Sequence, residues 1–193
     1  MHCRRLLRYL PYSRRIHAAL AGAALAVSCA LALPALATTP IKVTSKAATD
    51  GPIRYTVRVT SKQYGNATET RTLRSGDTDD FTWRTTPPGG PVPAPDGCPD
   101  NASLPLDANG AMVRETQLRL APIVDEHGTA NVQVSFRAQA PRGTRSVAHG
   151  GATLTCPDAV SYSEVVRFSM PTNGTAKLVT LGDGTQLSIS AQR

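Results

Sequence analysis

Residues 53–60 of the chain read IRYTVRVT, and this stretch decides the fold. Apolar and polar side chains alternate along it at every position. A period of two places successive side chains on opposite sides of an extended strand, whereas a helix repeats its apolar positions every third or fourth residue. The stretch is therefore predicted to be a β-strand with one face in the core. That face carries Ile53, Tyr55, Val57 and Val59.

Further strands are predicted along the rest of the chain, where alternation or a high content of β-branched residues recurs. The stretches are 41–47, 68–75, 79–86, 117–124, 131–138, 152–156 and 163–170. Runs that would form helices are nearly absent. The additional side chains expected in the core are Leu118, Leu120, Val132, Val134, Phe136, Val166, Phe168 and Met170.

Turn residues separate the predicted strands. Asp183-Gly184 forms the clearest hairpin turn, because both residues tolerate a positive φ. Gly128 and Asn173-Gly174 mark two further reversals. With roughly eight to ten strands, the chain is predicted to be all-β, a two-sheet antiparallel β-sandwich of the immunoglobulin-like kind. A small β-barrel has the same strand spacing, so periodicity leaves that alternative open.

Residues 85–110, TTPPGGPVPAPDGCPDNASLPLDANG, interrupt the alternation. This stretch is too long for a simple connection, so it is a functional loop, a linker or a tethered excursion. The strands before it are too few to close a core, which favours one domain over 38–193 with a long loop. Trp83 is expected in the core beside Phe81, or at a binding edge formed with the loop. The candidate partner-binding residues are Trp83, Pro87, Pro88, Pro91, Pro93 and Pro95.

The N-terminal 37 residues have the composition of a secretory signal peptide. Five arginines precede an Ala-rich apolar run that ends in the small-residue pattern Ala35-Leu36-Ala37. Cleavage after Ala37 is expected to leave a mature chain over 38–193 with no membrane-spanning segment, which implies a periplasmic or extracellular location. The general secretory and twin-arginine export routes both remain open.

Removal of this leader changes the charge balance of the chain. Of the 21 Lys and Arg residues, 16 remain in the mature chain beside 14 Asp and Glu, for a net charge near +2. The basic residues are scattered along strands rather than clustered, so nucleic acid is not expected as a partner.

Cys98 and Cys156 each begin the tripeptide Cys-Pro-Asp, and they are the two cysteines that follow the leader. They stand 58 positions apart, outside any C-x-x-C motif and without neighbouring histidines. This spacing is unlike a zinc site or a thioredoxin-like redox pair. In an exported protein it predicts a structural disulfide between the loop and the end of a strand.

Other polar residues provide no set for catalysis, a metal or a cofactor. Asp77, Asp79 and Asp80 lack the full pattern of a calcium loop, so we expect an acidic turn, and calcium binding there stays open. His127 and His149 lie in Gly-flanked stretches and are expected to be exposed. No nucleophile elbow, P-loop or zincin motif occurs.

The chain resembles the small uncharacterised exported β-domain proteins of Gram-negative Proteobacteria. The resemblance rests on the Ala-rich leader, ETRTLRSGD (69–77), HGTANVQVSFRA (127–138) and VTLGDGTQLSISA (179–191). It implies a periplasmic β-domain and assigns no functional residues. Chaperone-assembled pilins are also exported, Thr-rich β-sandwiches with one disulfide, but Gln192 stands where their penultimate aromatic residue would be.

The sequence therefore predicts a disulfide-stabilised, non-catalytic binding or accessory protein of the cell envelope, with a protein partner and no cofactor. Its contact surfaces would be the Pro-rich loop and exposed strand edges. A periplasmic enzyme or enzyme-inhibitor module is the alternative, and an adhesin or pilus-type subunit is the third. The partner and the oligomeric state are not predicted.

Overall fold

The computed structural model describes residues 51–193. The predicted signal peptide and the strand predicted at 41–47 lie outside the described residues. The strands are β1 (Ile53–Ser61), β2 (Gly65–Leu73), β3 (Asp79–Thr85), β4 (Val92–Pro93), β5 (Ala111–Met112), β6 (Arg114–Val124), β7 (Thr129–His149), β8 (Ala152–Pro171), β9 (Lys177–Thr180) and β10 (Gln186–Gln192). One short 3₁₀ turn, η1 (Asn101–Ser103), is the only helical element in this part of the chain. The described residues contain no helix that could span a membrane.

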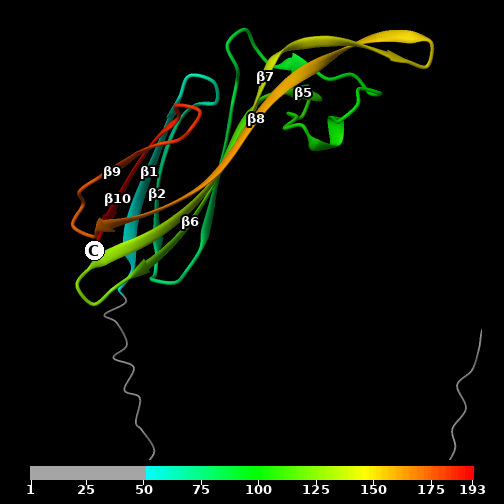
Figure 1. Cartoon of the computed structure of the whole chain (residues 1–193). Coiled ribbons are helices and arrows are strands. Elements are labelled where there is room, and N and C mark those ends of the chain that lie inside the picture. Colours follow the sequence, from blue (N-terminus) through cyan, green and yellow to red (C-terminus); the bar gives the residue numbers. More distant parts are fainter. Residues whose placement is uncertain (1–50) are drawn as a thin grey trace, which may run out of the picture. The chain divides into compact units, whose positions relative to one another are not determined.

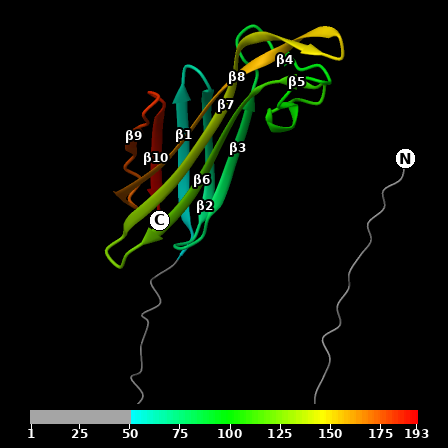
Figure 2. The same ribbon diagram turned by 45° about the vertical axis from the view of Figure 1, so that its right-hand side comes forward.

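Two four-stranded antiparallel sheets form the body of the fold (Figures 1 and 2). Sheet A has the strand order β2-β1-β10-β9, and sheet B has the order β3-β6-β7-β8. A separate two-stranded ladder joins β4 to β5. The two large sheets are open layers, so the predicted β-sandwich is confirmed and the small-barrel alternative is not.

The core lies between these sheets and follows the predicted alternation. Ile53, Tyr55, Val57 and Val59 on β1 are fully buried. They face the apolar side of sheet B, where Val132, Val134 and Phe136 of β7 and Leu118 and Leu120 of β6 are also buried. The turn predictions hold as well, because Gly128 and Gly184 both adopt a positive φ between paired strands.

β8 is longer than the strands predicted for this part of the sequence. The predicted strands at 152–156 and 163–170 are one continuous strand that pairs with β7 along its whole length. Pro157 does not interrupt it, because a proline without an N–H is tolerated in an edge strand. The ladder is irregular only between Pro141 and Gly143 on β7, and a β-bulge is a position that also accepts proline.

The burial of β8 also differs from expectation. Met170 is buried, but Val166 and Phe168 are only half-buried. β8 is the last strand of sheet B, and β9, the last strand of sheet A beyond β10, has only four residues. The side chains of β8 therefore lack a full covering layer.

Candidate functional site

The loop between β3 and β5 (residues 86–110) is attached to a two-stranded arm. β6 pairs with β7 only as far as Gln139, whereas β7 and β8 remain paired to the end of β7. We call this continuation, residues 140–160, the arm (Figure 1). The structure contains the predicted disulfide, in which Cys98 of the loop is bonded to Cys156 of the arm. Cys156 lies inside β8 rather than at a strand end, because β8 continues back to Ala152.

Polar contacts reinforce the attachment of this loop. Arg145 Nη2 of the arm donates to Asp100 Oδ2 of the loop at 3.3 Å. The Asn101 amide donates to the carbonyl oxygen of Pro95 at 2.9 Å. Asp107 Oδ1 accepts from the backbone N–H of Ala111 at 2.9 Å. These contacts join the middle of the loop to the arm and hold the backbone between Pro95 and Ala111 in a defined conformation.

A small second core lies beneath the loop, separate from the core of the sandwich. Met112 is fully buried, and its strand β5 pairs with β4. The disulfide is enclosed in the same region, since both of its cysteines are buried. The further buried residues of the loop and its flanks are Pro87, Ala94, Pro105 and Val113. The loop therefore has an apolar inner side of its own.

The outer side of the loop carries a row of prolines. Pro91, Pro93 and Pro95 are exposed, while Val92 between them is half-buried and Ala94 is buried. We call these three prolines the proline ridge. Extended backbone alternates its side chains, so the inward Val92 and Ala94 fix the prolines on the outer side. The proline ring also restricts φ, which lowers the entropy that the ridge would lose on binding.

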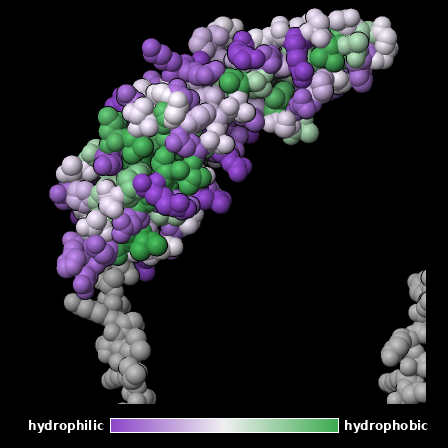
Figure 3. Space-filling view, in the orientation of Figure 1, coloured by the Kyte–Doolittle hydropathy of each residue, from purple (hydrophilic) through white to green (hydrophobic). Residues whose placement is uncertain are grey.

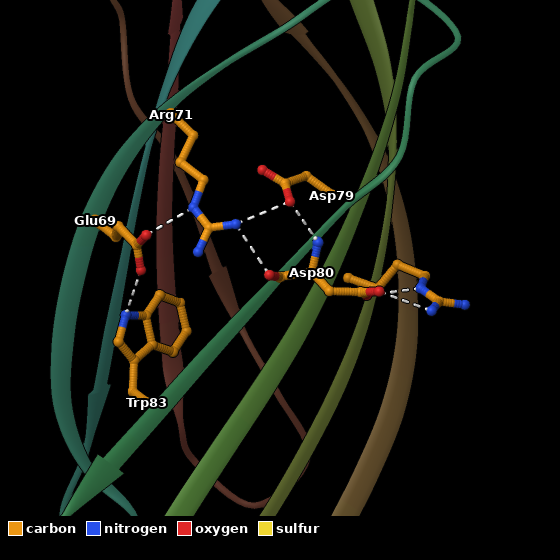
Figure 4. Close-up of polar contacts among 6 residues, drawn as sticks. Glu69, Arg71, Asp79, Asp80 and Trp83 are labelled. Atoms are coloured by element: carbon orange, nitrogen blue, oxygen red, sulfur yellow. Dashed lines mark hydrogen bonds and ion pairs between the residues drawn. The ribbon is translucent and has the colours of Figure 1, made fainter.

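The other predicted partner-binding residues occupy different positions. Pro88 is exposed near the ridge, whereas Pro87 is buried. Trp83 lies on β3 and packs against the sandwich core, with its ring stacked on Phe81 at a centroid distance of 5.6 Å. Its indole N–H donates to Glu69 Oε2 at 2.9 Å (Figure 4). The aromatic and polar contacts of Trp83 therefore join it to β2 and β3 rather than to the prolines.

A network of charged side chains joins the neighbouring edges of the two sheets (Figure 4). Arg71 of β2 is central: its Nε donates to Glu69 at 2.6 Å and its Nη1 donates to Asp79 of β3 at 2.8 Å. The guanidinium also lies 4.6 Å from the centroid of the Phe81 ring. Asp80 accepts two hydrogen bonds from Arg119 of β6, at 2.7 and 2.8 Å. We call Glu69, Arg71, Asp79, Asp80 and Arg119 the charged clasp.

Arginines of the charged clasp bind two of the three aspartates in the predicted acidic turn. Asp79 and Asp80 each face an arginine, and Asp77 accepts from the backbone N–H of Arg74. The hydrogen bonds from Arg119 lower the pKa of the Asp80 carboxyl. The hydrogen bond to Glu69 raises the pKa of Arg71. Among residues 51–193, no group of three or more His, Cys, Asp or Glu is arranged to hold a metal ion.

Tyr162 and Glu164 of β8 form a second polar pair, which the sequence did not indicate. The Tyr162 hydroxyl and the Gly182 N–H both donate to Glu164 Oε2. These two hydrogen bonds lower the pKa of Glu164, and the same contact raises the pKa of Tyr162. The pair joins β8 to the turn between β9 and β10, on the side of the sandwich opposite the clasp.

The two histidines of the described chain do not share a site. His127 is exposed in the β6–β7 turn, where its Nε2 lies 3.6 Å from the neighbouring Glu126. His149 is exposed at the end of the arm, next to Gly97 of the loop. Neither histidine has the combination of a carboxylate and a hydroxyl nucleophile that acyl transfer requires.

Shallow hollows lie on the outer face of sheet B. One of about 170 Å³ is lined by Asp80, Gln117, Arg119, Ser135 and Arg137. Its polar groups come from the clasp and from alternating outward positions of β6 and β7, and its two acidic oxygens already face Arg119. This arrangement offers hydrogen-bonding groups to a ligand but no nucleophile and base in contact.

Comparison with other proteins identifies a family but assigns no activity to it. No curated protein and no solved structure matches the chain. One family model matches residues 8–193, which is nearly the whole sequence, and it is described as a family of unknown function. The chain therefore belongs to DUF6013.

Proposed function

We propose that this protein is a non-catalytic binding or accessory protein of the bacterial cell envelope that holds a protein partner through its proline ridge. The observation that carries the proposal is the order of the loop. A disulfide, an ion pair and a small core of its own keep in place a loop that carries the three exposed prolines of the ridge. An apolar surface that is fixed before binding lowers the entropic cost of association.

The chemistry of the ridge indicates the kind of partner. Proline-rich ligands in the polyproline II conformation dock into grooves lined by aromatic side chains, because the ring is flat, apolar and already restricted in φ. Pro91, Pro93 and Pro95 present the same kind of ring from a backbone that alternates as a strand does, with Val92 and Ala94 turned inward. We therefore propose a partner with an aromatic-lined groove, and we place Trp83 outside this interface.

The proposed location rests on the leader and the disulfide. Disulfides persist in oxidising compartments such as the periplasm. The leader pattern predicts that the mature protein begins at Thr38. N-terminal sequencing of the protein recovered from a periplasmic extract tests this point. A protein that stays in the cytoplasm with its N-terminus intact contradicts it.

Photo-crosslinking tests the ridge directly. A photoreactive amino acid at position 93 is expected to capture one envelope protein, and the same amino acid at the exposed position Gln186 is not. The triple variant P91A/P93A/P95A is expected to lose this partner in co-purification. The matched control replaces three exposed prolines outside the ridge, P52A/P99A/P171A, and is expected to keep it. Equal recovery with both triple variants rejects the ridge as the contact.

A further inference from the structure

β8 has an outer edge that pairs with no other strand, and only its first part, around the buried Cys156 and Pro157, is attached to the loop. It is the terminal strand of sheet B, and no other strand of residues 51–193 pairs with its outer side. In an antiparallel ladder, alternate residues direct their N–H and C=O groups away from the paired neighbour. Alternate residues of the segment 159–170 therefore present a row of backbone donors and acceptors on the unpaired side. Such an edge is a template for pairing with another strand.

The other three edges of the two large sheets are protected. β2 and β3 carry Glu69, Arg71 and Asp79, which close that side through the clasp. β9 has only four residues and begins with Lys177. Short edge strands and charged side chains are common ways to prevent edge-to-edge pairing. Protection of three edges makes the fourth, β8, the distinctive one.

β8 lacks most of these protective features. Residues 159–170 contain no proline, glycine or lysine, and the β-bulge of the ladder lies outside this segment. Glu164 is the one charge on its inner side, and it is engaged by Tyr162 and the Gly182 N–H. The segment is regular and nearly neutral, so it has no built-in barrier to pairing.

Apolar side chains accompany this free edge. Val165, on the outer face of sheet B, is 53 % exposed, and Val166 and Phe168 on the inner side are half-buried. Leu178 of the facing strand β9 is 60 % exposed. Figure 3 shows hydrophobic residues at the surface over the region of β9 and β10, where β8 approaches the second sheet. A strand added beside β8 would bury part of this surface.

The sequence of the edge is partly symmetric about Val165, at the third and fourth positions on either side. Residues 161–169 read SYSEVVRFS, with serine at both ends and an aromatic residue three positions before and after the central valine. In antiparallel pairing about a two-fold axis, each residue faces the one at the mirrored position. Tyr162 would face Phe168 of the second copy, and Val165 would face its own counterpart. Aromatic and β-branched cross-strand pairs are stabilising.

We propose that two copies of this chain pair through β8, antiparallel, about a two-fold axis at Val165. In this register, Glu164 faces Val166 and Arg167 faces Ser163, so no like charges stand opposite each other. The pairing joins the two copies of sheet B into one continuous sheet. The surface is separate from the proline ridge, and the dimer would present two ridges, which raises the avidity for a multivalent partner.

The oligomeric state and its response to one charge test this proposal. Light scattering of the mature protein from about 1 to about 300 µM is expected to show a monomer–dimer equilibrium. V165K places two like charges face to face and is expected to raise the dimer dissociation constant at least about tenfold. I123K is the matched control: Ile123 is 64 % exposed on the same face of sheet B but away from the edge, and its variant is expected to dimerise normally.

Cross-linking tests the register. V165C is expected to give a disulfide-linked dimer on mild oxidation of the folded protein, whereas I123C is expected to form no covalent dimer. A protein that is monomeric throughout the concentration range, or a V165K variant that dimerises like the parent, overturns the proposal. The ridge is unaffected by V165K, so capture of a partner by that variant separates the dimer from the proposed function.

Discussion

The indole N–H of Trp83 donates to Glu69 across the boundary between the two sheets, at 2.9 Å. Trp83 belongs to β3 of sheet B and Glu69 to β2 of sheet A. The same carboxylate accepts from Arg71, which in turn contacts Asp79. One acidic side chain therefore links the only tryptophan of the chain to the charged clasp.

Replacement of Glu69 tests the contribution of this link. E69A leaves the indole N–H and one side of Arg71 without an acceptor, so the free energy of unfolding is expected to fall by about 1–3 kcal/mol. E69Q keeps an acceptor for the indole and is expected to lose less. Urea unfolding followed by Trp83 fluorescence measures both effects at the site of the change.

T68A provides the matched control for the Glu69 variants. Thr68 is the adjacent residue on β2 and is exposed on the opposite face. Its replacement is expected to change the free energy of unfolding by less than about 0.5 kcal/mol. If E69A unfolds at the same urea concentration as T68A, the contact between Glu69 and Trp83 does not stabilise the sandwich.

Alternation along the strands was enough to predict the main core. Val57 and Val134 follow the period-two pattern and are buried, because each lies on a strand with a neighbour on both sides. The same pattern in β8 placed Val166 in the core, yet Val166 is half-buried. Alternation assigns a side chain to a face of a sheet but does not reveal whether the strand is at an edge. That depends on pairing between distant residues.

Only some of the residues of the charged clasp could be recognised from the sequence. Glu69 and Arg71 lie on the same face of β2 as the buried Leu73, so the alternation of this strand already contained charged residues directed toward the core side. Inward charges of this kind are typical of edge strands and could have indicated the clasp. Their partners could not be named, because Asp79 and Trp83 of β3 reach them through the packing of two sheets.

The disulfide is expected to control the order of the loop. In the chain-entropy model, a cross-link between residues 58 positions apart stabilises the folded state by about 4 kcal/mol. The oxidised mature protein is expected to have a mass two hydrogen atoms below that of the reduced chain. After reduction, amide exchange should increase most in the segment around Cys98, and unchanged exchange there would show that the other loop contacts suffice.

Gly97 lies where the loop contacts the arm, so a substitution there tests this contact. Its φ is +94°, and a Cβ at this position would lie 2.9 Å from His149 Cδ2 and 3.3 Å from Leu154 Cδ1. G97A is therefore expected to displace the His149 ring in addition to straining the backbone. The expected observation is a shift of the His149 ring signals in the NMR spectrum, with a loss of about 1–2 kcal/mol in the free energy of unfolding.

A substitution at Gly90 separates the backbone strain from the displacement of the His149 ring. It has the same φ of +94°, but a Cβ there would meet no atom within 4 Å. G90A is expected to have a similar backbone cost and to leave the His149 signals unchanged. Identical spectra for both variants would mean that the loop does not approach the arm at Gly97.

Tyr55 provides a prediction about alkaline pH. Its side chain is fully buried, and its hydroxyl has no hydrogen-bond partner among residues 51–193. Burial disfavours the phenolate and raises the pKa of Tyr55 to about 12, above its ordinary value of 10.0. Because the folded state holds the proton more tightly, this contribution to stability is complete below pH 10 and is lost as the pH rises toward 12.

Y55F is expected to remove this alkaline loss without harm at neutral pH. The variant keeps the ring and deletes a buried hydroxyl without a partner, so its free energy of unfolding at pH 7 should equal that of the parent or exceed it by about 1 kcal/mol. Between pH 10 and 12 its stability should fall less steeply, although Tyr64 and Tyr162, whose pKa values are also raised, still contribute. Urea unfolding across this pH range measures the difference in slope. Destabilisation of Y55F at pH 7 by more than about 1 kcal/mol would show that the Tyr55 hydroxyl has a partner in the folded protein.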